Sequence, residues 1–234
     1  MIMEDLVKRI DQLKIKYETL KKEIARKIVG QEEIIDKILV AIFSNGHCLL
    51  IGVPGLAKTL MVTAISETLD LKYKRIQFTP DLMPSDIIGT EILDNQKEFR
   101  FIEGPLFANI ILADEINRTS SKTQSALLEA MEEHRVTVDG QTYPLPEPFV
   151  VLATQNPVGS AGTQLLPDSQ MDRFTVRLSI GYPEPADECS MVLARQGVNP
   201  LQTVEQVLSR QELVAMQDEA AAVYIKKELV EYIV

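Results

Sequence analysis

Short apolar runs alternate along the chain with segments that repeat apolar side chains every three or four residues. The runs cover residues 47–51, 75–78, 110–113, 149–154 and 176–180, and most of the intervals between them are long enough for a helix. Short continuous apolar runs are typical of strands buried on both faces, and strands alternating with helices are typical of a parallel sheet. The pattern predicts a three-layer α/β domain around a mainly parallel five-stranded sheet.

Residues 6–24 show a different pattern, in which apolar side chains recur at alternating spacings of four and three. This spacing describes one stripe of a helix, made by Leu6, Ile10, Leu13, Tyr17, Leu20 and Ile24. A helix packed on its own domain is favoured over a coiled coil, because about three heptads are few for a coiled coil. We predict an N-terminal amphipathic helix over residues 1–24. A second helical pattern, between Lys27 and Phe43, follows Gly30 and Gln31.

Two stretches interrupt the alternation of strands and helices. Residues 90–103 and residues 136–143 each combine two short strand-like runs with a central turn. The second turn contains Asp139 and Gly140, a favoured pair for a tight hairpin. Both stretches are therefore predicted to be hairpins inserted into the α/β domain, the first one turning at residues 94–96.

The pattern becomes wholly helical after a proline-containing segment at residues 181–185. Ser209 and Glu212 have the spacing of a capping box before an amphipathic run. We expect an α/β domain over residues 25–181 and a small helical lid over residues 182–234. The chain ends at Val234 within an apolar periodicity and without a capping signal, so we expect the lid to be incomplete.

Composition and net charge indicate a globular protein and argue against a membrane-spanning, secreted or non-specific nucleic-acid-binding one. Hydrophobic residues make up 45% of the chain and charged residues 25%, as in ordinary globular proteins. No run approaches the roughly 18 apolar residues of a membrane span, and the first residues lack a secretory pattern, so a cytoplasmic location is expected. The net charge of −10 makes non-specific binding to nucleic acid unfavourable.

The sequence GVPGLAKT at residues 52–59 has the order of a phosphate-binding loop between a strand and a helix. Gly52 and Gly55 allow the backbone N–H groups to curl around phosphate oxygens. Lys58 would reach the β and γ phosphates, and Thr59 would bind Mg²⁺. Ala57 stands where the general pattern has its last glycine. A chance Gly/Pro turn before a helix is the alternative interpretation.

Two further apolar runs end in polar residues suited to nucleotide chemistry. Asp114 and Glu115 follow the run at 110–113, and Asn156 follows the run at 149–154. Carboxyl ends of parallel strands meet at one edge of the sheet. Asp114 would hold Mg²⁺, Glu115 would orient and polarise the attacking water, and Asn156 would hold that water or a phosphate. The alternatives are an acidic helix cap and an ordinary turn before a proline.

With these motifs the chain resembles the AAA+ ATPases, and among them the MoxR group. Residues 52–59 resemble that group's Walker A motif, including its alanine before lysine. LADEINR at 112–118 resembles its Walker B motif, and ATQNP at 153–157 its sensor I. LPDSQMDRF at 166–174 resembles the segment that presents an arginine finger. The resemblance covers about residues 25–234.

The resemblance implies a homo-oligomeric ring, commonly a hexamer, with ATP between subunits and Mg²⁺ beside it. Glu115, Asn156 and Arg173 would be catalytic, with Arg173 reaching the γ phosphate of a neighbouring subunit. The two hairpins match inserts of this group, and Val29 and Gly30 match its adenine-side segment. The nucleotide-binding residues are predicted to be Val29, Gly30, Gly52, Val53, Pro54, Gly55, Leu56, Ala57, Lys58, Thr59, Leu60 and Asp114, of which Thr59 and Asp114 would bind the metal.

Family analogy further implies an ATP-hydrolysing chaperone or remodelling motor that acts on protein clients with a von Willebrand factor type A domain protein as partner. A nucleic-acid motor is a second possibility, but the hairpins carry few basic residues among several acids. A scaffold gated by ATP or ADP without efficient hydrolysis is a third. The group's second sensor arginine is not found before the chain ends, which keeps this third possibility open.

Overall fold

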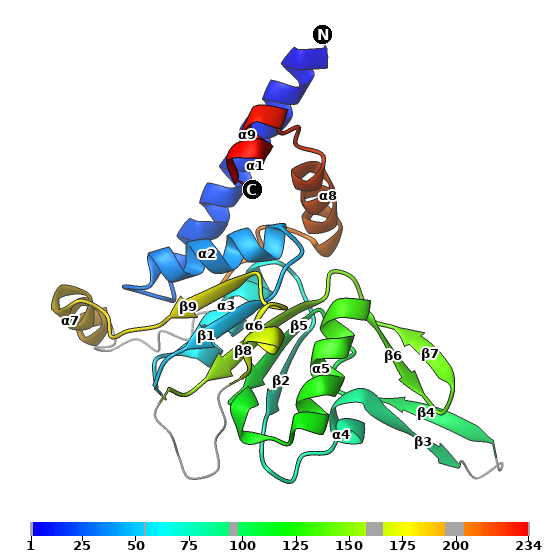
Figure 1. The fold of residues 1–234 in the computed structure, drawn as a ribbon. Coiled ribbons are helices and arrows are strands. Elements are labelled where there is room, and N and C mark those ends of the chain that lie inside the picture. The colour runs from blue at the N-terminus through cyan, green and yellow to red at the C-terminus, as the bar shows by residue number, and fades with distance from the viewer. Residues whose placement is uncertain (1, 54, 94–97, 158–165, 195–203, 234) are drawn as a thin grey trace.

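The computed structural model describes residues 2–53, 55–93, 98–157, 166–194 and 204–233. Its main sheet has five strands in the order β2-β5-β8-β1-β9, and every neighbouring pair is parallel (Figure 1). The strands are β1 (Cys48–Ile51), β2 (Tyr73–Gln77), β5 (Ile110–Asp114), β8 (Val150–Gln155) and β9 (Val176–Ser179). The predicted α/β fold with a five-stranded parallel sheet is confirmed.

The helices within the described residues occupy most of the intervals between strands. They are α1 (Ile2–Ala25), α2 (Glu32–Phe43), α3 (Lys58–Thr68), α4 (Pro84–Ile88), η1 (Ile116–Arg118), α5 (Ser121–Glu133), α6 (Asp168–Met171), α7 (Pro185–Ala194), α8 (Arg210–Ala221) and α9 (Lys227–Ile233). The helix expected after Gly30 and Gln31 begins at Glu32, as predicted, because Gly30 turns the chain with φ of 76°. The strand expected from residue 75 begins at Tyr73, which pairs with Ile110.

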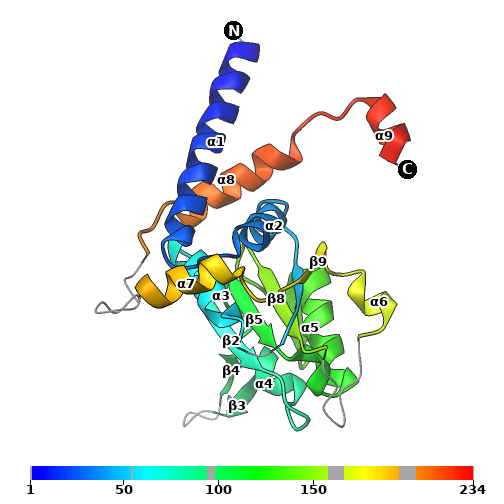
Figure 2. The ribbon, with the colours of Figure 1, turned by 90° about the vertical axis from the view of Figure 1, so that its left-hand side faces the viewer.

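Alternate residues of each central strand enter two separate cores. Leu50 and Leu112 pack with α1, α2, α3 and α8, whereas Leu49 and Ile111 pack with α4 and α5. This period of two is expected for a strand that is buried on both faces. Figure 2 shows α3 and α5 on opposite sides of the sheet, so the three predicted layers are present.

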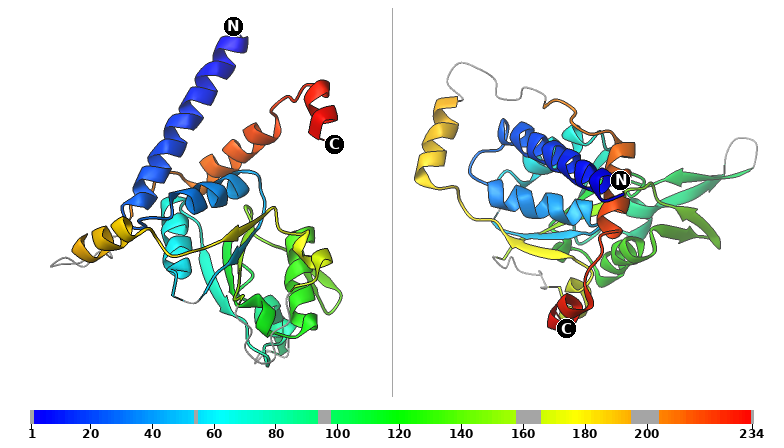
Figure 3. Two further views of the ribbon diagram at one scale, coloured as in Figure 1. Left: turned by 60° about the vertical axis from the view of Figure 1, so that its left-hand side comes forward. Right: turned by 90° about the horizontal axis from the view of Figure 1, so that it is seen from above.

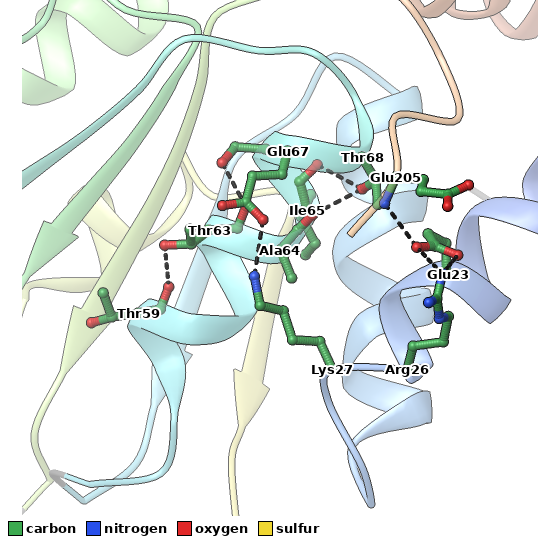
Figure 4. Close-up of polar contacts among 11 residues, drawn as sticks. Glu23, Arg26, Lys27, Thr59, Thr63, Ala64, Ile65, Glu67, Thr68 and Glu205 are labelled. Atoms are coloured by element: carbon green, nitrogen blue, oxygen red, sulfur yellow. Dashed lines mark hydrogen bonds and ion pairs between the residues drawn. The ribbon is translucent and has the colours of Figure 1, made fainter. Parts of the chain in front are cut away.

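The C-terminal half of α1 packs on the α/β domain. Leu20 and Ile24 are fully buried in the core that includes α2 and α3. Beyond the helix, the Lys27 ammonium lies 2.9 Å from a Glu67 carboxylate oxygen on α3. Figure 4 shows this ion pair, together with Glu23, which accepts a hydrogen bond from the Glu205 backbone N–H at 2.8 Å. The first helix therefore packs on its own domain at this end.

Helix α8 covers the same face of the sheet as α2. Its predicted capping box is present, since the Ser209 N–H donates to the Glu212 carboxylate at 2.9 Å and the Glu212 N–H to the Ser209 hydroxyl at 3.3 Å. Leu213 and Met216 join the core, and Gln217 Nε2 donates to the Ile42 carbonyl at 2.7 Å. Within the described part of the chain, no helix is long and apolar enough to cross a membrane.

The two predicted hairpins are both present and lie next to one another. They are formed by β3 (Gly89–Leu93) with β4 (Phe99–Glu103) and by β6 (Arg135–Val138) with β7 (Gln141–Pro144). The Phe101 ring stacks on the Tyr143 ring, with centroids 4.1 Å apart. Figure 3 shows both hairpins projecting from the same side of the domain. The predicted turn at residues 94–96 lies outside the described residues.

The buried side chain of His47, just before β1, forms hydrogen bonds with β8 and with α5. His47 Nδ1 accepts a hydrogen bond from the Val151 N–H at 3.0 Å, and Nε2 lies 3.2 Å from the Met131 carbonyl, to which its N–H donates. Burial lowers the pKa of His47 to about 4, because a charged ring loses its hydration. The neutral ring therefore has a structural role.

We predict that Ile24→Ala lowers the free energy of unfolding by about 2–4 kcal/mol, because it leaves a cavity in the core. The matched variant Ile15→Ala, on the same helix, should change it by less than about 0.5 kcal/mol, because Ile15 is 66% exposed. Urea unfolding of the whole chain measures both. Equal losses would show that α1 contributes helix propensity alone.

We predict a steep acid dependence of stability that originates at His47. The pKa is lower in the folded than in the unfolded chain, so the unfolded state binds more protons between about pH 6.5 and 4. The free energy of unfolding should then fall by about 1 kcal/mol for each pH unit of acidification in that window. His47→Gln should remove this component, whereas His134→Gln should retain it. An unchanged slope in His47→Gln would contradict the assignment.

Candidate functional site

A cavity of about 510 Å³ opens at the carboxyl edge of the sheet, where β1, β2, β5 and β8 end. Ligands of open parallel sheets bind at this edge. The cavity is lined by Gly52, Gly55, Ala57, Lys58, Thr59, Leu60, Arg75, Gln77, Asp114, Glu115, Thr154 and Asn156. The structure thus brings together most of the loop residues predicted from sequence with Asp114, Glu115 and Asn156.

The loop between β1 and α3 needs glycine at two positions for different reasons. A Cβ atom on Gly52 would come within 2.8 Å of the Ile180 carbonyl oxygen, whereas Gly55 has open space but a φ of 90°. Ala57, in place of the usual glycine, has a φ of 53°. That left-handed conformation costs an alanine about 1–2 kcal/mol. The loop geometry is therefore retained without the third glycine.

Lys58, at the first position of α3, brings a positive charge to the loop side of the cavity. Its ammonium donates a hydrogen bond to the Gly52 carbonyl at 2.6 Å, which draws the side chain back along the loop. Burial lowers the pKa of Lys58, and the nearby carboxylates of Asp114 and Glu115 act in the opposite direction. The lysine and the N-terminus of α3 together create a site that favours an anion.

Asp114 ends β5 with both carboxylate oxygens engaged. Oδ1 accepts the Thr154 hydroxyl at 2.6 Å, and Oδ2 accepts the Arg75 guanidinium from Nη2 at 2.6 Å and from Nε at 3.2 Å. The Thr154 oxygen in turn accepts the Glu115 N–H at 2.8 Å. Hydrogen bonds from β2 and β8 therefore fix this carboxylate, and the parallel register determines which residues can reach it.

Glu115 follows Asp114 with a left-handed backbone, φ 56°. Its Oε2 accepts hydrogen bonds from Arg118 Nη1 at 2.6 Å and from Gln77 Nε2 at 3.2 Å. Gln77 Oε1 accepts a bond from Arg75 Nη2 at 2.7 Å. The two acids are therefore joined through Thr154 on one side and through Arg75 and Gln77 on the other.

The donor set at this edge fits a magnesium ion. Thr59 contributes a hydroxyl oxygen and Asp114 a carboxylate, and both line the same cavity as Lys58. Hard oxygen ligands are the ones that Mg²⁺ prefers. Glu115 and Asn156 line the same space with groups that can bind a water molecule, so the arrangement suits hydrolysis of a phosphate ester or anhydride.

A second cavity of about 210 Å³ adjoins the first, and Gly55, Ala57 and Leu60 line both. Its other lining residues are mainly apolar: Lys27, Ile28, Val29, Gln31, Leu56, Tyr182, Pro183, Glu188 and Met191. An apolar slot beside a phosphate site suits a planar base. Val29 lines this slot. Gly30 does not line it, but its backbone packs closely against Pro183 and Asp187, because a Cβ at this position would lie 2.9 Å from both residues.

Arg173 and Val53, like Gly30, line neither of these two cavities. Arg173 pairs with Glu132 at 3.1 Å, donates to the Ser169 carbonyl at 3.0 Å and lines a separate cavity of about 400 Å³. Val53 packs against the core that includes α3 and lines neither cavity. Pro54 lies outside the described residues.

The structure adds three residues that the sequence reasoning missed, namely Arg75, Gln77 and Thr154. A usable signal was present for the first two, because residues two apart in a strand share a face and the expected strand began at Arg75. Thr154 ends the third apolar run, directly before the predicted polar turn. Its partners could be identified only from the register of β8 beside β5.

The comparisons with known proteins agree with this geometry. A family model described as "ATPase family associated with various cellular activities (AAA)" matches residues 47–176. Chaperone MoxR1 of Mycobacterium tuberculosis and protein YeaC of Bacillus subtilis are each 47% identical over 91% and 90% of the chain. The chain spans 56% and 66% of the lengths of these two relatives. A crystal structure from Cytophaga hutchinsonii is 41% identical, with a TM-score of 0.89, over all of this chain and 71% of that one.

We predict that Thr154→Val lowers the free energy of unfolding by about 2 kcal/mol, because it leaves the partly buried Glu115 N–H without its acceptor and Asp114 without a donor. Thr154→Ser keeps the hydroxyl and should cost less than about 1 kcal/mol. Chemical denaturation measures both variants. If valine and serine cost the same, the hydroxyl does not anchor the two acids.

Proposed function

The chain belongs to the MoxR group of AAA+ ATPases, and we propose that it binds ATP with Mg²⁺ and hydrolyses ATP to ADP and phosphate. One observation carries this proposal. Lys58, Thr59, Asp114 and Glu115 come from two different strand ends and line one cavity beside an apolar slot. A lysine, a hydroxyl group and two carboxylates in one cavity are the groups that a nucleoside triphosphate with its Mg²⁺ requires.

Each residue has a role that follows from its chemistry. The loop N–H groups and Lys58 would bind the phosphates, and Thr59 and Asp114 would hold the cation. Mg²⁺ supplies charge neutralisation at the phosphate oxygens when it is bound. Glu115 would orient the attacking water and take its proton, while Asn156 would fix the water or the γ phosphate by hydrogen bonds.

The base of the nucleotide would occupy the apolar slot between the loop and α7. Tyr182, Pro183, Glu188 and Met191 line this slot from the segment after β9. A bound nucleotide would therefore contact both the α/β core and the predicted lid over residues 182–234. Binding and hydrolysis would change the position of one against the other, which is how we propose that the motor produces motion.

Arg173 suits a role at the site of a neighbouring subunit. Its side chain is 38% exposed and lines a cavity remote from Lys58. An arginine finger supplied by a second subunit stabilises charge on the transferred phosphoryl group. We therefore propose a homo-oligomeric ring, most simply a hexamer, whose sites are completed between subunits.

A protein client fits this chain better than nucleic acid. The chain carries a net charge of −10, and the β3–β4 hairpin exposes Ile92, Leu93 and Phe99. Apolar exposed groups favour contact with protein surfaces. A relative at 47% identity is named a chaperone. We propose a chaperone or remodelling activity, with a von Willebrand factor type A domain protein as partner by family analogy.

Steady-state ATP hydrolysis over a range of protein concentrations tests this proposal. The rate per subunit should rise with concentration. Lys58→Ala should weaken nucleotide binding by at least about tenfold through loss of charged contacts. Arg173→Ala should retain binding and lose about 10³-fold in hydrolysis. Arg177→Ala, a nearby exposed arginine on β9, is the matched control and should remain active.

Mixing the two inactive variants separates a shared site from a defect within one subunit. Lys58→Ala still supplies Arg173, and Arg173→Ala still supplies an intact loop, so their mixture should regain part of the activity. A mixture that stays inactive, with each variant still forming rings, would contradict a finger acting between subunits. If wild type binds ATP without turnover at any concentration, a nucleotide-gated scaffold replaces the motor.

A further inference from the structure

Arg75 occupies one of the two carboxylate oxygens that a cation at Asp114 could use. Its guanidinium binds Oδ2 through two nitrogens, at 2.6 and 3.2 Å, a charge-assisted contact of the stronger kind. Oδ1 is held by Thr154 at 2.6 Å. Oδ2 accepts two N–H groups and has no lone pair left, whereas Oδ1 keeps one beside the Thr154 contact. A cation can therefore use Oδ2 only if Arg75 releases it, and the guanidinium charge opposes a cation at either oxygen.

Thr154 is the partner that stays in place. It is 1% exposed, lies within β8, and also accepts the Glu115 N–H at 2.8 Å. Moving it would leave the partly buried Glu115 N–H without its acceptor, which is costly. The Arg75 side chain is 47% exposed, and a long exposed arginine changes rotamer at little cost. Arg75 is therefore the partner that yields.

Arg75 keeps a partner at the cavity wall when it leaves Asp114. Its Nη2 also donates to Gln77 Oε1 at 2.7 Å, and both side chains line the cavity with Lys58. In this position the guanidinium would still present its charge to bound phosphates. While it pairs with Asp114, it reduces the repulsion that the carboxylate would exert on an approaching anion.

We propose that Arg75 is a positioning residue that competes with Mg²⁺ for Asp114 and thereby sets the Mg²⁺ concentration at which nucleotide is held. The arginine neutralises the carboxylate before the cation arrives and is displaced when the cation enters with ATP. This inference rests on the proposed binding of ATP and Mg²⁺ in the same cavity.

Binding of a fluorescent ATP analogue to the whole chain, with Mg²⁺ varied from chelator-buffered to millimolar levels, tests the competition without relying on hydrolysis. Arg75→Gln should lower the half-saturating Mg²⁺ concentration about threefold to tenfold, the range expected for loss of a charge-assisted pair. Arg75→Lys retains the charge and should lie between glutamine and wild type. It provides a second measurement if the glutamine variant unfolds.

Lys74→Gln is the matched control, because it removes the same charge from the neighbouring exposed position, whose side chain points to the other face of β2. It should change the half-saturating Mg²⁺ concentration by less than about twofold, as expected for a screened surface charge. Melting temperatures of all variants establish that each is folded.

Two results would overturn the competition while leaving the proposed function intact. One is an Arg75→Gln protein that binds the analogue in a Mg²⁺-dependent way but needs as much Mg²⁺ as wild type, or more. The other is a Lys74→Gln protein whose requirement falls equally, which would show a general charge effect. Wild type that binds no analogue at any Mg²⁺ concentration would instead overturn the proposed function itself.

Discussion

The parallel pairing of the five strands is the constraint on which the rest of the structure depends. A buried strand must pair its backbone N–H and C=O groups. In this sheet each neighbouring pair of strands is parallel, so the five strands run in the same direction. Their carboxyl ends therefore meet at one edge. Because β5 lies between β2 and β8, Asp114 at its end lies between Arg75 on one side and Thr154 on the other.

Two residues with a left-handed backbone lie at this edge, beside the paired polar groups. Ala57 and Glu115 both have positive φ, at 53° and 56°, and such conformations cost about 1–3 kcal/mol unless the surroundings impose them. Here the neighbouring strands supply the restraint, since Glu115 donates its N–H to Thr154. These restraints place a lysine, two acidic residues and their hydrogen-bond partners around one cavity.

Helices from both ends of the chain meet on α2. Leu20 of α1 and Leu213 of α8 belong to the same core as Leu39, and Lys16 of α1 pairs with Glu212 of α8 at 2.5 Å. The slot proposed for the base is lined by residues just before α2 and by residues of α7. A nucleotide bound as proposed would therefore contact both the segment that leads into α2 and helix α7.

The hydrophobic pattern determined the fold class and the five strands of the main sheet, because burial on both faces of a strand leaves a continuous apolar run. The two hairpins were predicted from short strand-like runs together with turn residues such as Asp139 and Gly140. The spacing of glycine, lysine and threonine likewise predicted the phosphate loop, and the ends of the runs located Asp114, Glu115 and Asn156. Only the tertiary structure decided that Arg75, Gln77 and Thr154 join them and that Val53 does not. The alternation along the strand indicated only that Arg75 and Gln77 share a face. Their partners depend on strand order and register, which arise from pairing between segments distant in sequence.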